Sequence, residues 1–251
     1  MFSPNNESET NLRKKLDLDK LPAHVAVIMD GNGRWAQKKH KLRIFGHREG
    51  INRVREIVRC SGNIGIKYLT LYAFSVENWK RPRKEVNALM GLLKEFLRKE
   101  VDDLNKNNVT IRYIGRTNEL PESALLEMAK AEKILHNNTG LVLTLALNYG
   151  GRAEIIDAVR KIADDIKKDK LSPENLNEEI FSKYLYTSLY PDPDLLIRTS
   201  GEIRISNYLL WQIAYSEIYI TSTLWPDFKE KEYLEAILDY QKRNRRFGAV
   251  G

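Results

Sequence analysis

The sequence predicts a single α/β domain with a mostly parallel central sheet of about six strands flanked by helices. Short runs of apolar and β-branched residues alternate along the chain with longer segments of helical periodicity. The runs are almost continuously apolar, as is typical of parallel strands buried on both faces. There is no internal repeat and no Gly/Ser-rich linker, and the length of 251 residues fits one large domain.

The alternation assigns most of the chain to named segments. Six runs are expected as strands: residues 24–29, 68–74, 109–114, 141–148, 195–198 and 217–221. Helical spacing marks residues 49–61, 86–105, 122–136, 153–168 and 229–246. Ser172-Pro173-Glu174 is typical of the start of a further short helix. Residues 1–20 are polar without apolar periodicity, so we expect a flexible N-terminal arm before a domain over residues 21–251.

Composition excludes several classes of protein. Hydrophobic residues make up 42% and charged residues 30%, which excludes a disordered chain. The single cysteine, Cys60, excludes an internal disulfide framework and a multi-cysteine zinc site. No apolar run approaches the roughly 20 residues of a transmembrane segment, and the N-terminus lacks a signal-peptide pattern. We therefore expect a cytoplasmic protein.

The excess of basic residues leaves two kinds of partner open. Lys+Arg 41 against Asp+Glu 34 gives a net charge of +7, and the densest basic stretch covers residues 34–55. One interpretation is a basic pocket for a small polyanion such as a diphosphate. The alternative is a nucleotide- or RNA-binding α/β protein, whose binding would depend steeply on salt.

A glycine-rich segment, Asp30-Gly31-Asn32-Gly33-Arg34-Trp35-Ala36, follows the first expected strand. It matches the dinucleotide fingerprint G-x-G-x-x-G/A, but Asp30 would then repel a pyrophosphate. The next strand begins near Tyr68, so an acid at its end would lie well beyond the about 20 residues expected of a ribose-binding acid. A dinucleotide site is therefore disfavoured.

The same segment fits a diphosphate together with a divalent cation. Gly31 and Gly33 allow backbone N–H groups to approach phosphate oxygens. Asp30 suits Mg²⁺, which prefers carboxylate and phosphate oxygens. Arg34, Arg43 and His47 follow closely enough to contact the same anion.

Polar residues also follow other expected strands. After the second strand, Ser75 and Asn78 could bind a substrate or cap a helix, and Arg81 could grip phosphate. Arg198 ends the fifth strand, and Arg204 and Ser206 follow it; together they suggest a second anion site. Glu217 is either the second carboxylate of a metal site or a charge at a strand edge.

Six motifs, in this order, resemble those of the cis-prenyltransferase family, and the bacterial synthases of undecaprenyl diphosphate are the most similar group. The motifs are VAVIMDGNGRWA (25–36), RIFGHREG (43–50), LTLYAFSVENWKRP (69–82), NYGGR (148–152), LIRTSGEIRISNYLL (196–210) and WQIAYSEIYITSTLWPDF (211–228). The resemblance runs from about Leu21 to Gly248, nearly the whole chain.

The resemblance implies an enzyme that adds isopentenyl diphosphate units to farnesyl diphosphate with Mg²⁺, making undecaprenyl diphosphate, the precursor of the lipid carrier of bacterial wall glycans. A synthase of shorter or longer products is the alternative within the family. The resemblance also implies a homodimer, an apolar tunnel beside the sheet, no nucleic-acid partner and no transmembrane segment. Because the product is a lipid, peripheral contact with the membrane is expected.

The resemblance also implies roles for individual residues. Asp30 would be the essential aspartate near the allylic diphosphate and its Mg²⁺, with Glu217 as a further metal ligand. Allylic substrate binding is implied for Gly31, Asn32, Gly33, Arg34, Trp35, Arg43 and His47. The reaction site would include Ser75, Val76, Glu77, Trp79 and Arg81. Isopentenyl diphosphate would be bound by Arg198, Arg204, Ile205 and Ser206. Asn78 is implied in proton abstraction, but a carboxamide is a poor base, so we expect it to orient the substrate.

The resemblance leaves two features for the structure to locate. The apolar residues 89–97 and 141–147 are our candidates for the tunnel walls, and the small Ala73 favours a long product. The tail Arg245-Arg246-Phe247-Gly248 resembles the family's Arg-x-Gly ending, which would reach the partner subunit's site.

Overall fold

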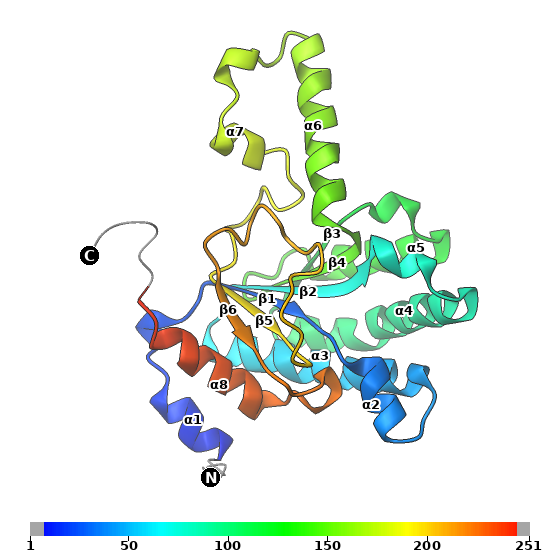
Figure 1. Cartoon of the computed structure of the whole chain (residues 1–251), viewed down its shortest axis with the longest axis vertical. Helices are drawn as coiled ribbons and strands as arrows, with labels where there is room; N and C mark the ends of the chain where they lie inside the picture. Colours follow the sequence, from blue (N-terminus) through cyan, green and yellow to red (C-terminus); the bar gives the residue numbers. More distant parts are fainter. Residues whose placement is uncertain (1–7, 245–251) are drawn as a thin grey trace.

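The structure, a computed structural model, describes residues 8–244 and contains one six-stranded sheet (Figure 1). All five strand pairings are parallel, and the strand order is β3-β4-β2-β1-β5-β6. The strands are β1 His24–Ile28, β2 Tyr68–Ser75, β3 Thr110–Ile114, β4 Val142–Tyr149, β5 Leu195–Arg198 and β6 Glu217–Ile220. The predicted single α/β domain with a parallel sheet is confirmed.

In the part of the chain that the structure describes, eight α-helices connect or flank these strands. They are α1 Glu9–Lys15, α2 Asn32–Lys38, α3 Arg43–Ile64, α4 Arg83–Lys106, α5 Glu122–Leu135, α6 Gly151–Lys167, α7 Glu178–Ser182 and α8 Glu230–Gln241. The 3₁₀ turn η2, Val76–Lys80, follows β2. Helix α3 begins at Arg43, whereas the sequence predicted a start near residue 49. The prediction missed the first turns because they carry site residues instead of an apolar stripe. Within the described residues, no helix combines the length and apolar character needed to cross a bilayer.

The two faces of the sheet pack against different partners. Val25 and Val27 of β1 join the main core, to which α3, α4, α5 and α8 also contribute. Ala26 and Ile28, on the opposite face, join a smaller core with Tyr208 of the segment after β5. This alternation follows from the two-residue period of a strand. Helices α6 and α7 project away from the sheet (Figure 1).

The described part of the predicted N-terminal arm is a docked helix. Leu12 of α1 is 4% exposed, and Arg13 Nε donates a hydrogen bond of 2.7 Å to Glu230 Oε1 of α8. Ser8 caps α1 through a hydrogen bond from Asn11 N. The prediction of a flexible arm is therefore wrong for these residues, because a seven-residue helix with one buried apolar residue shows no periodicity.

Helix α3 packs closely against α2, the helix that precedes it in the chain. A Cβ on Gly46 would collide with the carbonyl oxygen of Asn32, whereas a Cβ on Gly62 of the same helix would meet nothing within 4 Å. Gly46 thus permits the contact between α2 and α3 that places the glycine-rich segment over the sheet edge.

We expect Gly46→Ala to lower the free energy of unfolding by about 1–3 kcal/mol, because backbone atoms must move to accept the methyl group. Gly62→Ala, the matched control in α3, should raise it by about 0.5–1 kcal/mol through helix propensity. Urea unfolding of both variants measures the difference. Equal stability of the two variants would contradict the close contact.

Candidate active site

The site lies at the edge of the sheet where its parallel strands end. Strand β1 lies between β2 and β5, so Asp30, Ser75 and Arg198 all reach this edge. A cavity of about 690 Å³ opens there. Predicted site residues that line it are Asp30, Gly31, Asn32, Gly33, Arg34, Arg43, His47, Ser75, Glu77, Asn78, Arg81, Arg198 and Ser206. The structure thus brings together most of the predicted set, as the binding rule for open parallel sheets leads one to expect.

Asp30 is held between backbone and two arginines. Its Oδ1 accepts a hydrogen bond from Gly31 N at 2.7 Å, and its Oδ2 accepts one from Arg198 Nη2 at 2.9 Å. Arg34 Nη2 lies 3.3 Å from the same Oδ2. Burial opposes ionisation of Asp30, but the hydrogen bond and charge of Arg198, with the charge of Arg34, lower its pKa below the usual value. The group is therefore a carboxylate.

Arg198 connects this carboxylate to the loop after β5. Its side chain is 4% exposed, and Nη1 donates a 2.7 Å hydrogen bond to Ser206 Oγ and another to the carbonyl oxygen of Arg204. Ser206 has a φ of 47°, in the left-handed region that non-glycine residues rarely adopt. Ser206 thus adopts an uncommon backbone conformation at the position where its hydroxyl accepts the hydrogen bond from the buried guanidinium of Arg198.

Glu85 of α4 links three cationic or titratable groups on the other side of the cavity. Its Oε1 accepts a 2.9 Å hydrogen bond from Arg81 Nη1 and lies 3.8 Å from both Arg43 Nε and His47 Nε2. The Arg43 guanidinium also lies over Gly33, where a Cβ would come within 3.0 Å of Nε. Sequence reasoning missed Glu85, because one acid at the start of a helix carries no distinguishing pattern.

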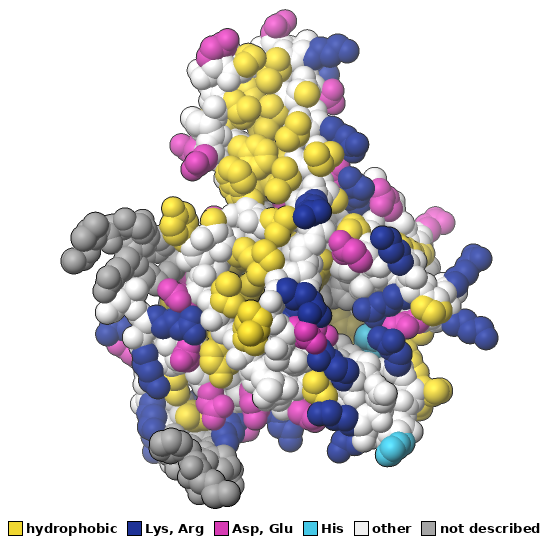
Figure 2. All heavy atoms as spheres, viewed as in Figure 1, with side chains coloured by type: hydrophobic (Ala, Val, Ile, Leu, Met, Phe, Trp, Pro, Cys, Tyr) yellow, Lys and Arg dark blue, Asp and Glu magenta, His cyan; other side chains and the backbone are white. Residues whose placement is uncertain are grey.

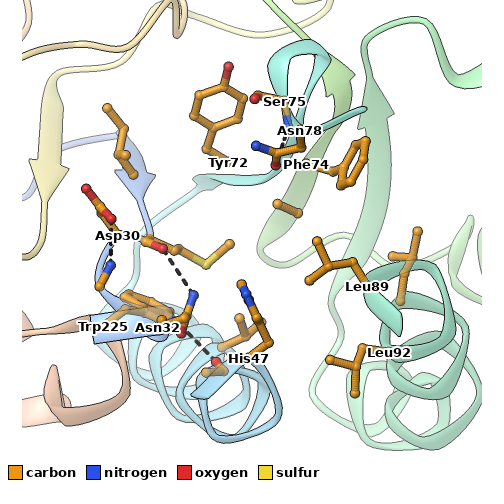
Figure 3. A pocket seen from close by; sticks show the side chains of 18 of the residues that line it. Asp30, Asn32, His47, Tyr72, Phe74, Ser75, Asn78, Leu89, Leu92 and Trp225 are labelled. Atoms are coloured by element: carbon orange, nitrogen blue, oxygen red, sulfur yellow. Dashed lines mark hydrogen bonds between the residues drawn. The ribbon is translucent and has the colours of Figure 1, made fainter. Parts of the chain in front are cut away.

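Ser75 and Asn78 cap the η2 turn reciprocally. The Ser75 side chain meets the backbone of Asn78, and Asn78 Oδ1 accepts a 3.2 Å hydrogen bond from Ser75 N. Both residues also line the cavity, across from Asp30 (Figure 3). With its oxygen already accepting, Asn78 presents an NH₂ donor rather than an acceptor for a proton.

Asn207 joins three site segments, and sequence reasoning did not single it out. Its Nδ2 donates to Glu77 Oε1 at 2.8 Å, its Oδ1 accepts from Arg152 N at 2.9 Å, and its carbonyl accepts from Gly151 N at 2.7 Å. Asn207 also has a left-handed φ of 60°. The available signal was its residue type, because asparagine tolerates this conformation.

Six predicted residues do not line the cavity: Trp35, Val76, Trp79, Arg204, Ile205 and Glu217, which is described below. Trp35 Nε1 donates to Asp227 Oδ1 at 2.8 Å, and Trp79 Nε1 donates to Asn148 Oδ1 at 2.7 Å. The side chain of exposed Arg204 pairs with Glu202 at 2.5 Å. The first five of these residues border the site, and Trp79 is placed by the asparagine of the NYGGR motif.

Glu217 lies away from Asp30 within the chain. It begins β6 opposite Leu195, whereas Arg198, at the far end of β5, pairs with Ile28 just before Asp30. Glu217 Oε2 accepts a 2.9 Å hydrogen bond from Arg243 Nη1. The strand register therefore separates the two carboxylates that we predicted to serve one metal site.

The inner part of the cavity is apolar. Leu89, Leu92 and Leu93 of α4 line it opposite Leu145 and Leu147 of β4. Figure 3 shows Leu89 and Leu92 on the right of the space and Asp30 on the left, with Ser75 and Asn78 at the top between them. Both segments chosen as candidate tunnel walls thus contribute, although Leu141 does not line the cavity.

Comparison with known proteins assigns the family. The family profile described as "Putative undecaprenyl diphosphate synthase" matches residues 28–248. The chain belongs to the undecaprenyl diphosphate synthase family of isoprenyl transferases. An isoprenyl transferase of Clostridium tetani is 56% identical over 94% of this chain and 92% of the relative. A ditrans,polycis-undecaprenyl-diphosphate synthase of Pasteurella multocida, (2E,6E)-farnesyl-diphosphate specific, is 53% identical over 94% and 98%.

Solved structures of the family share this fold. Lavandulyl diphosphate synthase from Lavandula x intermedia, in complex with dimethylallyl diphosphate, has a TM-score of 0.90 at 38% identity, covering 92% of this chain and 99% of that one. A probable undecaprenyl diphosphate synthase from Campylobacter jejuni has a TM-score of 0.75 at 32% identity, covering 90% and 98%. The protein is thus a prenyltransferase enzyme, and the dinucleotide-binding and RNA-binding interpretations give way to that assignment.

We expect His47 to make stability depend on pH. Burial, and then the charge of Arg81, lowers the pKa of His47 to about 4, below the unfolded value near 6.5. The contribution of neutral His47 to the free energy of unfolding is complete above pH 6.5 and is lost as pH falls toward 4. The reason is that the histidine of the unfolded chain takes up its proton at a higher pH than that of the folded protein. The free energy of unfolding should therefore fall by on the order of 1–2 kcal/mol per such histidine between pH 7 and 5.

Urea unfolding at the two pH values, in the natural protein and in His47→Asn, measures this contribution. The variant should lose less stability on acidification. His24 is the internal reference, because burial also lowers its pKa to about 4 and it is present in both proteins. The same pH dependence in both proteins would show that His47 protonates as easily folded as unfolded.

Proposed function

We propose that this enzyme condenses isopentenyl diphosphate units with farnesyl diphosphate to make undecaprenyl diphosphate. The observation that carries the proposal is a cavity with four arginines at its polar end and leucines at its apolar end. Guanidinium groups bind phosphate oxygens bidentately, and an apolar space favours a growing hydrocarbon chain by about 0.8 kcal/mol per buried CH₂. The farnesyl-specific relative and the bound dimethylallyl diphosphate of the lavandulyl synthase support this substrate class.

Two diphosphates can be assigned to neighbouring parts of the polar end. We assign the allylic diphosphate to Arg34 and Arg43 beside Gly31 and Gly33, where α2 begins. We assign isopentenyl diphosphate to Arg198, at the end of β5, and to the loop that follows it, which contains Arg204 and Ser206. Asp30 lies where the two assignments meet, because it contacts Arg34 and Arg198 at once.

Mg²⁺ fits the donor set at this position. The deprotonated Asp30 supplies one hard oxygen ligand, and Mg²⁺ characteristically combines one or two carboxylates with substrate phosphate oxygens and water. Among residues 8–244, no group of three His, Cys, Asp or Glu side chains could hold a metal by itself. Asp30 would therefore hold the ion together with the substrate, and the ion would stabilise negative charge on the leaving diphosphate.

The residues of the site support ionisation of the allylic substrate. Departure of diphosphate places negative charge on its oxygens, which the arginines stabilise from fixed positions without reorganising. Arg198 is fixed by Asp30 and Ser206 before substrate arrives, and Arg81 by Glu85. Asn78 faces the cavity with its amide NH₂ and would orient the substrate, as its engaged oxygen suggests.

We further propose that the enzyme is a homodimer formed through the apolar strip that includes α6. Figure 2 shows apolar side chains gathered along the α6–α7 projection and across the middle of the molecule. Exposed large apolar residues of this part of the chain include Ile156, Val159, Leu176, Leu189, Ile203 and Tyr215. Apolar area of this extent marks an interaction surface, and a two-fold axis would pair the strip with itself. The Arg-x-Gly tail expected to reach the partner lies outside the described residues.

A cytoplasmic location and peripheral membrane contact remain part of this proposal. The substrates are water-soluble diphosphates, whereas the product is a lipid that must enter a membrane.

We expect Asp30→Ala to reduce turnover by at least about 10³-fold, because it removes the metal ligand and leaves Arg198 buried without its carboxylate. The assay follows labelled isopentenyl diphosphate with farnesyl diphosphate and Mg²⁺, and chromatography sizes the products. Asp103→Ala is the control, since it breaks a comparable 2.9 Å arginine pair, with Arg59, away from this cavity. Circular dichroism checks folding, and near-normal turnover of Asp30→Ala would reject the site.

We expect Ile156→Glu combined with Val159→Glu to make the protein monomeric, because two charges would be buried against a second copy. Leu126→Glu on α5 is the matched control, since Leu126 is 55% exposed outside the strip and its variant should remain dimeric. Light scattering after size exclusion gives the mass. An unchanged mass of the double variant would place the dimer interface elsewhere.

A further inference from the structure

A second cavity lies beyond the active-site cavity, between the same two helices. It has a volume of about 90 Å³ and is lined by α3 from Arg55 to Asn63, by α4 from Phe96 to Leu104, and by Asn107 just after α4. The main cavity contacts α3 from Arg43 to Val54 and α4 from Leu89 to Phe96. The two spaces therefore follow one another along a single groove between α3 and α4.

Phe96 is the residue at which the two cavities meet. Of the described residues, it alone lines both, and its side chain is buried with 6% exposure. Leu92 and Leu93 stand on the side of the main cavity, and Leu104 stands on the side of the second. These positions recur at helical spacing on one face of α4, so the aromatic ring closes the groove as a partition.

The second cavity has an apolar floor and a charged rim. Val58, Leu104 and Val109 line it. At its rim Arg55 Nε donates a 2.6 Å hydrogen bond to Glu100 Oε2, and Arg59 Nη2 lies 2.9 Å from Asp103 Oδ1. These ion pairs tie α3 to α4 beyond Phe96, so the far end of the groove is spanned by paired charges while its interior suits hydrocarbon.

We propose that Phe96 is a specificity-determining residue that limits the length of the prenyl product. The proposal rests on the function proposed above. A growing chain fills the main cavity and gains free energy with each buried CH₂, until the next unit must displace the Phe96 ring. Forcing further carbons into a space already filled by the ring is unfavourable, which opposes this gain and favours release of the product. Without the ring, the two cavities would become one.

The test compares the products of Phe96→Ala and Phe96→Trp with those of the natural enzyme. With farnesyl diphosphate, excess isopentenyl diphosphate and Mg²⁺, Phe96→Ala should give products at least one five-carbon unit longer, and Phe96→Trp shorter ones. Leu97→Ala is the matched control, since Leu97 is 2% exposed and lines neither cavity.

The possible outcomes separate this inference from the proposed function. Unchanged product lengths in both variants, or the same shift in Leu97→Ala, would overturn the role of Phe96. Absence of any prenyl product from the natural enzyme would instead refute the proposed function. If Phe96→Ala unfolds, the milder Phe96→Leu and the larger Phe96→Trp still give opposite expected shifts.

Discussion

The buried pair between Asp30 and Arg198 is the interaction on which the site depends. Arg198 ends β5 with 4% of its side chain exposed, and Asp30 follows the neighbouring β1. A guanidinium so enclosed requires a carboxylate, because removing one partner of a buried pair leaves an uncompensated charge at a cost of about 3–5 kcal/mol. Arg34 and Ser206 then attach to the same two residues, so the loops after β1 and β5 keep one relative position.

This arrangement explains how a cationic site can form at the end of an apolar cavity. Each arginine here has a protein partner: Asp30 for Arg34 and Arg198, and Glu85 for Arg43 and Arg81. The pairing limits repulsion among the four cations while leaving their remaining N–H donors for an anion. These residues are far apart in the sequence, but the parallel sheet brings them to one edge. The adjoining face of α4 supplies the leucines of the apolar end.

Much of the fold could be predicted from the sequence, because the four inner strands β1, β2, β4 and β5 are largely apolar and their ends coincide with polar motifs. Helix α1 could not be predicted because it is short. Helix α2 could not be predicted because its first turn carries glycine and arginine instead of an apolar stripe. The role of Asn207 depends on a left-handed backbone that only coordinates reveal. Glu217 was misplaced relative to Asp30 because the register of β6, and not its composition, decides which end carries the acid.

Glu85 has a consequence for which ligands the polar end accepts. Its carboxylate already neutralises part of the charge of Arg43 and Arg81, so it acts as a built-in counterion with which an incoming anion must compete. A singly charged ligand gains little by replacing one carboxylate with another. A diphosphate carries enough charge to compete, so discrimination against weaker anions is inherent in the resting state of the protein.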